Sequence, residues 1–515
     1  ASTVVEEPPI ADQPDEPASP VTRLIIQGAT LIPQQQLSDL FSDYVGRNIT
    51  RSQCQQLALK LSHVYRQKGW LARVEIPMPD RDKGWLYVNI TEAHFAGSEI
   101  SSSESRVNQK LIQEYIVGTL KPGDILPLQK LESAILQAND LPGVETDAVL
   151  ESANHPGSTK LSLNIRDLPL IQGSLQYTNY GIRAIGSNQY QGNFSVNNPS
   201  GRGDQLNVQA VGSENMVNVR GQYSWLLVDL DTRFSLYGSH LDYSLAGAYS
   251  QLQPEGEGRI LGGSLRRNLL RSTTQNLYAS LSLENRSNQS SHSVIQDRLR
   301  NINLLSMDLS GDHQDHWMGL AHSNYGLQLN LGHLAIDLES DRYLDSVTTQ
   351  AQGEFLKLNL RADRTHSIGE EWQTYLSFTA QWAANNLDSS QKFSLGGPSG
   401  VRAFPVNEAM GDSGWIVNLE LRRSLYPGLQ GFVFVDTGGI RIDQTNWTGR
   451  LSTTNNYLLS GVGLGLRFNL SNQWLASASV ALPVTHNPGQ DNYKHNSDGT
   501  RATDPAGWLS LTRVF

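Results

Sequence analysis

Two charged residues in the C-terminal part of the chain have types and surroundings that suit an ion pair. Arg402 lies in a loop flanked by Gly and Pro, and Asp436 lies between Gly431 and Gly438 in an otherwise apolar strand pattern. A carboxylate in such a strand is costly unless it faces water or a base. A nearby guanidinium gives it a charge-assisted bond. Two interpretations stay open from these residues alone: a solvated loop arginine, or an Arg402–Asp436 pair.

The remaining polar clusters favour turns over catalysis. Nothing in the sequence places one group of possible metal ligands on a rigid element, which favours a polar loop: Asp312, His313, Asp315 and His316. A turn around Asp498-Gly499 explains a second group. No Walker motif, nucleophile elbow or zinc motif is present. The single cysteine, Cys54, excludes a disulfide framework. We therefore expect no enzyme activity, no catalytic residue, no metal and no cofactor.

Composition narrows the class of protein. The 515 residues carry a net charge of −10, which argues against a general nucleic-acid binder. Only 38% of residues are hydrophobic and 17% are charged. A large soluble enzyme usually shows roughly 45–50% and about 25%. No run approaches the ~18 apolar residues of a membrane helix. A membrane β-barrel stays possible, because strands that alternate apolar and polar residues have a mean hydropathy like that of a soluble protein. Because the chain starts at Ala1, we expect a mature protein whose signal peptide was removed.

The first third of the chain divides into a linker and a repeated pattern. Residues 1–20 hold five prolines and many acids, which predicts a flexible linker. Residues 21–94 and 95–167 each show one strand, two helices and two strands, so they predict two βααββ modules. In the first module the helices are expected at 34–45 and 52–68, with Gly69 at the helix end. In the second they are expected at 105–117 and 128–137.

Residues 168–515 follow a period of two. Leu277, Ala279, Leu281 and Leu283 alternate with polar residues, and 356–362, 415–422 and 462–470 repeat the pattern. Apolar and polar faces that alternate over about 350 residues fit lipid outside and water inside, and roughly 16 strands fit this length. Trp and Tyr at strand ends suggest an interfacial girdle. The chain ends on the aromatic Phe515, as Gram-negative outer-membrane barrels do, which marks Phe515 as an assembly signal.

An ordered set of short motifs resembles a known family over residues 21–515. In the first module the motif is Tyr65, Gly69 and Trp70, followed by 85–92; in the second it is 139–144 with 156–163. The barrel opens with 177–181 and 197–204. Later come Leu395-Gly396-Gly397, then Val401, Arg402, Ala403 and Phe404, then Phe434, Asp436 and Gly438. This set resembles the two-partner secretion outer-membrane transporters of the TpsB type.

The resemblance implies a fold, a location and partners. It implies two periplasmic POTRA domains (polypeptide-transport-associated), a 16-stranded barrel in the bacterial outer membrane, and an inward-folded hairpin whose Arg402 bonds Asp436. It implies type V secretion of a large exoprotein, recognised unfolded through its N-terminal secretion domain. Outer-membrane lipids and the barrel assembly machinery are the further expected partners, and nucleic acid is not.

The chain departs from the family at two points, and two other functions stay open. Ala403 stands where the family has Gly, so a positive φ there would cost up to about a kcal/mol. The prolines of residues 1–20 do not suit a helix that plugs the pore. The first alternative function is an outer-membrane assembly factor, which shares the fold. The second is a passive channel, which leaves residues 21–167 without a role.

Overall fold

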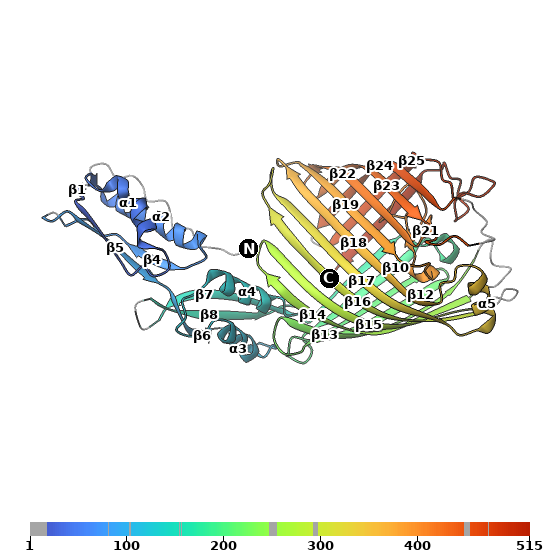
Figure 1. The fold of residues 1–515 in the computed structure, drawn as a ribbon, viewed down its shortest axis with the longest axis horizontal. Coiled ribbons are helices and arrows are strands. Elements are labelled where there is room, and N and C mark those ends of the chain that lie inside the picture. Colours follow the sequence, from blue (N-terminus) through green and yellow to red (C-terminus); the bar gives the residue numbers. More distant parts are fainter. Residues whose placement is uncertain are drawn as a thin grey trace. The chain divides into compact units, whose positions relative to one another are not determined.

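The computed structural model describes residues 18–80, 82–101, 105–153, 155, 157–246, 255–291, 297–447, 454–471 and 473–515 (Figure 1). They form two compact units that divide after Asp167, except that Leu141–Gly143 packs with the second. Of the expected linker, residues 1–17 lie outside the described residues. Ser19–Pro20 form strand β1, paired with β3 (Asn48–Ile49), so the linker prediction was wrong for these two residues.

The first module is a three-stranded sheet covered by helices. Strand β5 (Trp85–Glu92) lies in the centre, parallel to β2 (Arg23–Gln27) and antiparallel to β4 (Ala72–Glu75). Helix α1 (Gln34–Phe41) continues into a 3-10 turn (Ser42–Tyr44). Helix α2 (Arg51–Gln67) begins with a capping box between Thr50 and Gln53. Buried apolar residues of α1, α2 and β5 form one core.

The expected motif Tyr65, Gly69 and Trp70 builds the end of α2. Gly69 has φ +83° and donates to the carbonyl of Arg66, while Trp70 donates to the carbonyl of Tyr65. These are the two bonds of a Schellman motif, which needs a residue that tolerates positive φ. Trp70 then pairs with Pro127, and Gly69 accepts a bond from the backbone of Leu128. The motif therefore ends a helix of the first module and joins it to the second.

The second module repeats the order of elements. Its sheet has the order β6-β8-β7, in which β6 (His94–Ile100) is parallel and β7 (Val144–Ser152) antiparallel to β8 (Ser158–Asp167). Helix α4 (Leu128–Asn139) follows α3 (Gln109–Thr119). The expected start at residue 105 was wrong, because the Asp167 carboxylate accepts bonds from the Ser105 hydroxyl and the Arg106 backbone. Over the described residues, no helix combines the length and apolarity that crossing a membrane requires.

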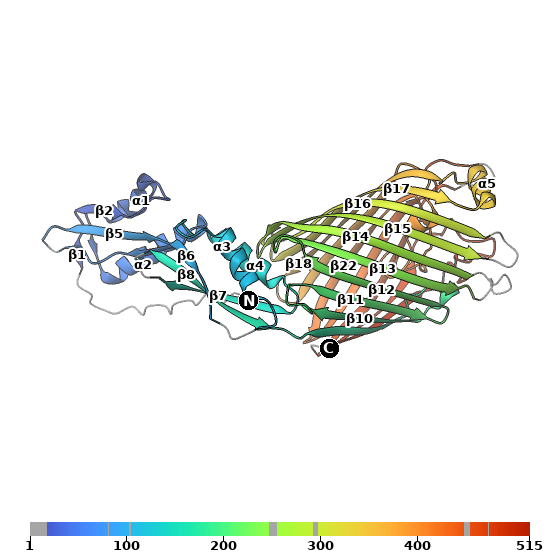
Figure 2. The same cartoon turned by 90° about the horizontal axis from the view of Figure 1, so that it is seen from below.

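The rest of the chain confirms the predicted barrel of 16 strands. Neighbouring strands along the chain pair antiparallel around the barrel (Figure 2), and β26 pairs with β9 to close it. The strands are β9 (Ile171–Thr178), β10 (Gln189–Asn197), β11 (Gln205–Ser213), β12 (Met216–Leu226), β13 (Thr232–Ser244), β14 (Glu255–Arg271), β15 (Gln275–Ser291), β16 (Arg298–Asp315), β17 (Ala321–Ile336), β18 (Gly353–Ile368), β19 (Trp372–Ala383), β22 (Ser413–Tyr426), β23 (Leu429–Arg441), β24 (Asn456–Ser471), β25 (Trp474–Pro483) and β26 (Ala506–Val514).

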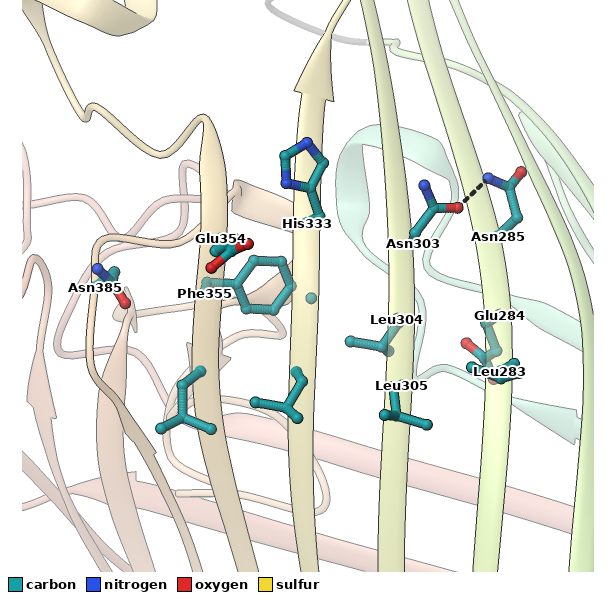
Figure 3. Close-up of a pocket in the computed structure, with 13 residues that line it drawn as sticks. Leu283, Glu284, Asn285, Asn303, Leu304, Leu305, His333, Glu354, Phe355 and Asn385 are labelled. Carbon is teal, nitrogen blue, oxygen red and sulfur yellow. Dashed lines mark hydrogen bonds between the residues drawn. The ribbon is translucent and has the colours of Figure 1, made fainter.

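The outer face of the barrel carries an apolar band with a sharp upper edge. On β15 to β18 the register aligns one apolar row, Leu283, Leu305, Leu331 and Leu356. The next outward row toward the β17–β18 connection is polar: Asn285, Asn303, His333 and Glu354. Figure 3 labels the polar row together with Leu283 and Leu305 of the apolar row, and Asn285 donates to Asn303 at 2.8 Å. Both rows lie beside a hollow of about 1000 Å³. An apolar band bounded by polar residues suits a bilayer edge.

Glu92, the last residue of β5, ties three segments of the first module together. Its buried carboxylate accepts bonds from the backbone of Thr30 (2.8 Å) and Leu31 (2.9 Å), from the Tyr65 hydroxyl (3.0 Å) and from the Thr30 hydroxyl. Burial alone raises the pKa of Glu92, but the hydrogen bonds outweigh it and hold this pKa below its usual value. Burial and the bond to Glu92 raise the pKa of the Tyr65 hydroxyl.

We expect this network to set the acid stability of the module. The contribution of ionised Glu92 is complete above the ordinary glutamate pKa of about 4.3 and is lost as pH falls through its lowered folded value. At pH 7, Tyr65→Phe removes one bond to the carboxylate and lowers the unfolding free energy of residues 18–167 by about 1.5–3 kcal/mol, measured by urea denaturation. Tyr44→Phe is the control, since the Tyr44 hydroxyl has no partner among the described residues. Equal losses in both variants contradict the role of Glu92.

Candidate functional site

The connection between β19 and β22, residues 384–412 (the hairpin), folds into the lumen of the barrel. Its arms pair through β20 (Phe393–Ser394) and β21 (Met410–Gly411). The expected tip residues Val401, Arg402, Ala403 and Phe404 are all buried. The tip is tight, because a side chain on Gly400 would meet the carbonyl of Leu395. A buried tip in the middle of a wide barrel requires partners on the wall.

Arg402 finds those partners on β23 and β22. Its Nε and Nη2 donate to the two carboxylate oxygens of Asp436 at 2.8 and 2.7 Å, and its backbone N donates to the same carboxylate at 3.0 Å. Its Nη1 donates to Glu420 at 2.6 Å. Asp436 is fully buried and Glu420 is 3% exposed. The planar guanidinium thus holds two carboxylates at once, an arrangement that suits Arg and not Lys.

Three residues that the sequence analysis did not single out complete this network. Asn418 donates to Asp436 and to the carbonyl of Gly400, both at 2.8 Å, and so joins wall and tip. Arg422 and Arg467 donate to Glu420 at 2.8 and 3.0 Å. In the sequence, Asn418 and Glu420 stand only as polar positions of the alternating stretch 415–422, with no local signal of their role. The three arginines and two carboxylates leave one net positive charge at the wall.

Two further contacts hold Arg402, one at its backbone carbonyl and one at its guanidinium group. Trp508 of β26 donates its indole N–H to the carbonyl of Arg402 at 2.8 Å. The guanidinium carbon lies 3.5 Å from the ring centroid of Phe434, a cation–π contact. Phe434 and Gly438 lie on the inner face with Asp436, and Leu395 of the hairpin lies against Gly438. The motif Phe434, Asp436 and Gly438 on the barrel wall is therefore the surface against which the hairpin packs.

Ala403 causes no backbone strain. Its φ is not positive, so the expected cost of replacing the family's Gly does not arise. Its methyl group occupies the place that a side chain on Gly461 would take. The small residues Gly461, Gly463 and Gly465 of β24 do not leave open space in the lumen. The rings of Phe434 and Phe432 lie where side chains on Gly463 and Gly465 would be, and Ala403 fills the third place.

Phe515 lies at the seam where the barrel closes. Its backbone exchanges two hydrogen bonds with Gly173 on β9, at 2.9 and 3.0 Å. Its ring lies over Gly173, where any side chain would collide with it, and 5.9 Å from the ring of Phe194. Deleting or displacing this ring removes packing from the closing pair of strands.

The polar group at residues 312–316 is not a loop as expected. Asp312 to Asp315 belong to the end of β16. Asp312 accepts a bond from Asn276 at 2.9 Å, and Asp315 accepts two from Arg364 at 2.8 and 3.0 Å. Among the residues that the structure describes, no group of three or more His, Cys, Asp or Glu side chains is placed to hold a metal ion.

Comparisons with known proteins identify the family. The model described as "Haemolysin secretion/activation protein ShlB/FhaC/HecB" matches residues 157–468, and the ShlB-type POTRA domain matches residues 19–93. The chain is similar to the heme/hemopexin transporter protein HuxB of Haemophilus influenzae, with 25% identity over 488 residues that cover 93% of this chain and 84% of HuxB.

Two solved structures share the fold. CdiB from Escherichia coli gives a TM-score of 0.70 at 18% identity and covers 99% of this chain and 93% of its own. BamA from Haemophilus ducreyi lacking POTRA domains 1–3 gives 0.59 at 11% identity, covering 97% and 100%, which shows the fold alone. The family match favours secretion over the assembly alternative. The chain therefore belongs to the ShlB/FhaC/HecB haemolysin secretion/activation family, as a two-partner secretion transporter that forms a pore in the bacterial outer membrane with its POTRA domains in the periplasm.

Proposed function

We propose that the hairpin holds this secretion pore in a resting state until an unfolded exoprotein arrives from the periplasm. The observation that carries the proposal is the buried Arg402, which bridges Asp436 and Glu420 inside the lumen. Breaking a buried pair by removing one partner costs about 3–5 kcal/mol, because a charge is left unpaired. Water and the polar groups of a passing chain can replace the pair, so it is strong enough to hold the hairpin and still releasable.

Capture of the exoprotein is proposed at the free edge of strand β7. In this strand the Thr146 backbone N–H and C=O are both bonded to the side chain of Asn139, so they face away from β8. Backbone groups two residues apart face the same way, which places those of Ala148 and Leu150 on the free edge. Val149 and Leu150 are 58% and 37% exposed there. An exposed apolar edge accepts an added strand and tolerates many sequences.

The rest of the proposed role needs no chemistry at the site. The bound chain passes through the barrel in extended form, and its folding outside the cell makes return unfavourable. We propose no catalytic activity, and no nucleic-acid partner for a chain of net charge −10. The apolar band would contact outer-membrane lipids, and the barrel assembly machinery would insert the chain. We retain 21–94, 95–167 and 168–515 as the proposed domains, because each sheet takes its strands from one of these ranges, apart from β1 at residues 19–20 and the first residue of β6, His94.

The first test separates edge capture from other binding. Leu150→Pro removes an edge donor but no bond to β8, so residues 18–167 should fold normally and lose about tenfold or more in affinity for the unfolded N-terminal domain of the exoprotein. Leu150→Ala is the control for the lost side chain. Titration calorimetry in low salt measures both. Equal affinities of the Pro variant and wild type would exclude this edge.

The second test concerns the pair in the lumen. Arg402→Ala and Asp436→Ala should reduce the exoprotein in the medium while heat-modifiable barrel persists in the outer membrane. The double variant should be little worse than Arg402→Ala, because both single variants remove the same interaction. Arg402→Lys should rescue poorly because lysine cannot hold two carboxylates in one plane. Arg266→Ala controls for luminal charge, since Arg266 stacks on Tyr278 of the neighbouring strand. Defects that multiply in the double variant would show that the residues act separately.

The third test concerns assembly. Deleting Phe515 should lower the amount of folded barrel, as judged by heat modifiability. Gly173→Val should lower it as well, since its side chain occupies the place of the Phe515 ring while the terminal residue stays intact. Normal barrel levels with lost secretion would contradict a role of Phe515 in assembly.

A further inference from the structure

The extracellular connection between β25 and β26, residues 484–505 (the cover segment), has a folded core of its own. Asp491 accepts bonds from the backbone of Tyr493 and His495 at 2.8 and 2.7 Å. His495 pairs with Arg501 across a short bridge. Asn487 is buried and Ser497 is exposed, and both donate to a residue of the hairpin.

That residue is Glu408, on the second arm of the hairpin. Its side chain is 2% exposed. Asn487 donates to Oε1 at 2.7 Å, and Ser497 donates to Oε2 through its backbone N at 2.8 Å and its hydroxyl at 2.6 Å. The backbone carbonyl of Glu408 accepts bonds from Leu395 and Gly396 of the first arm at 3.2 and 3.1 Å. One residue therefore joins both arms of the hairpin to the cover segment.

The backbone around Glu408 is bent to make this contact. Asn407 has φ +64° and Ala409 has φ +57°, a region that residues with a side chain rarely adopt. Such conformations persist where surrounding contacts require them, and they gather at clamps and switches. The two residues turn the chain on either side of Glu408, so that its carbonyl meets the first arm and its carboxylate meets the cover segment.

Glu408 differs in kind from the pair at the tip. No Lys, Arg or His among the described residues lies within ion-pair distance of its carboxylate, which is held by neutral donors alone. Neutral donors stabilise a buried carboxylate only while all of them stay in place, and water can take their role once the site opens. This contact therefore consists of hydrogen bonds from neutral groups, whereas Arg402 forms salt bridges.

We propose that Glu408 is a positioning residue that clasps the hairpin to the cover segment, so that the two move as one body when the pore opens. The inference rests on the proposed resting role of the hairpin. The clasp lies at the base of the hairpin and the Arg402 network at its tip. Opening then requires release of the Arg402 network at the wall, and the hairpin and the cover segment leave their resting position together.

The first experiment measures open probability of the purified full-length protein in planar bilayers without exoprotein. Glu408→Gln keeps the shape of the side chain but turns an N–H₂ toward a donor, so open probability should rise about tenfold. Asn487→Asp, which faces Glu408 with a second carboxylate, should act in the same direction from the other side of the clasp. Glu339→Gln, at the exposed start of α5 (Glu339–Val347), is the charge control and should leave open probability unchanged.

The outcomes separate the clasp from the resting role itself. If Arg402→Ala raises open probability and neither clasp variant does, the clasp is overturned and the resting role stands. If Arg402→Ala has no effect either, the resting role has failed. Wild-type amounts of heat-modifiable barrel in every variant exclude a general folding defect as the cause of a change.

A second experiment does not depend on weakening the contact. Glu408→Cys and Ser497→Cys are combined with Cys54→Ser, which removes the native cysteine. A short bis-thiosulfonate reagent joins the two sites through reducible bonds. Because the proposal has hairpin and cover segment moving together, linked protein should secrete at the rate of the unlinked variant. Loss of secretion that a reductant restores would show that the two must separate, and would overturn the proposal.

Discussion

The luminal side of this barrel is organised by the need to pair one buried carboxylate. Asp436 is fully buried on β23, and an uncompensated charge there would weigh heavily against folding. Among the residues that the structure describes, the cation that reaches both of its oxygens is Arg402 of the hairpin. The carboxylate therefore draws residues 384–412 into the lumen, and Arg402 in turn fixes Glu420, Arg422 and Arg467 around it. The position of the hairpin is a consequence of this charge balance.

Shape complementarity supports the same arrangement. On β24, Gly461, Gly463 and Gly465 are spaced two residues apart and so lie on the same face of the strand. Ala403, Phe434 and Phe432 fill the space beside them. The guanidinium groups of Arg402 and Arg467 lie over the rings of Phe434 and Phe432, respectively. The glycines of β24, the two phenylalanine rings and the two guanidinium groups are stacked in layers. This stacking lets the hairpin tip lie close to the backbone of the wall. A side chain at any of the three glycines would push the tip away from Asp436.

Much of this molecule could be predicted from local patterns, and the rest depends on register. Period-two alternation predicts barrel strands because successive side chains point to opposite faces, and the C′ position of Gly69 follows from helix geometry. The pairing of Arg402 with Asp436 was predicted from the resemblance to the transporter family. Glu420, Trp508 and Gly461 were not foreseen as partners of the tip, because strand pairing across distant segments brings them there. The strand character of Asp312–Asp315 and the late start of α3 also depend on partners far along the chain, Asn276, Arg364 and Asp167.

The seam between β9 and β26 has a consequence for folding kinetics. Gln176 and Thr512 are hydrogen-bonded across it, although 336 positions separate them along the chain. Contacts of such sequence separation form late, because the entropy of closing the loop must be met before any bond forms. Closure also has to wait until β26 is available to pair with β9. Until then both terminal strands present unpaired edges, which makes the interval before closure the period in which aggregation competes most strongly with folding.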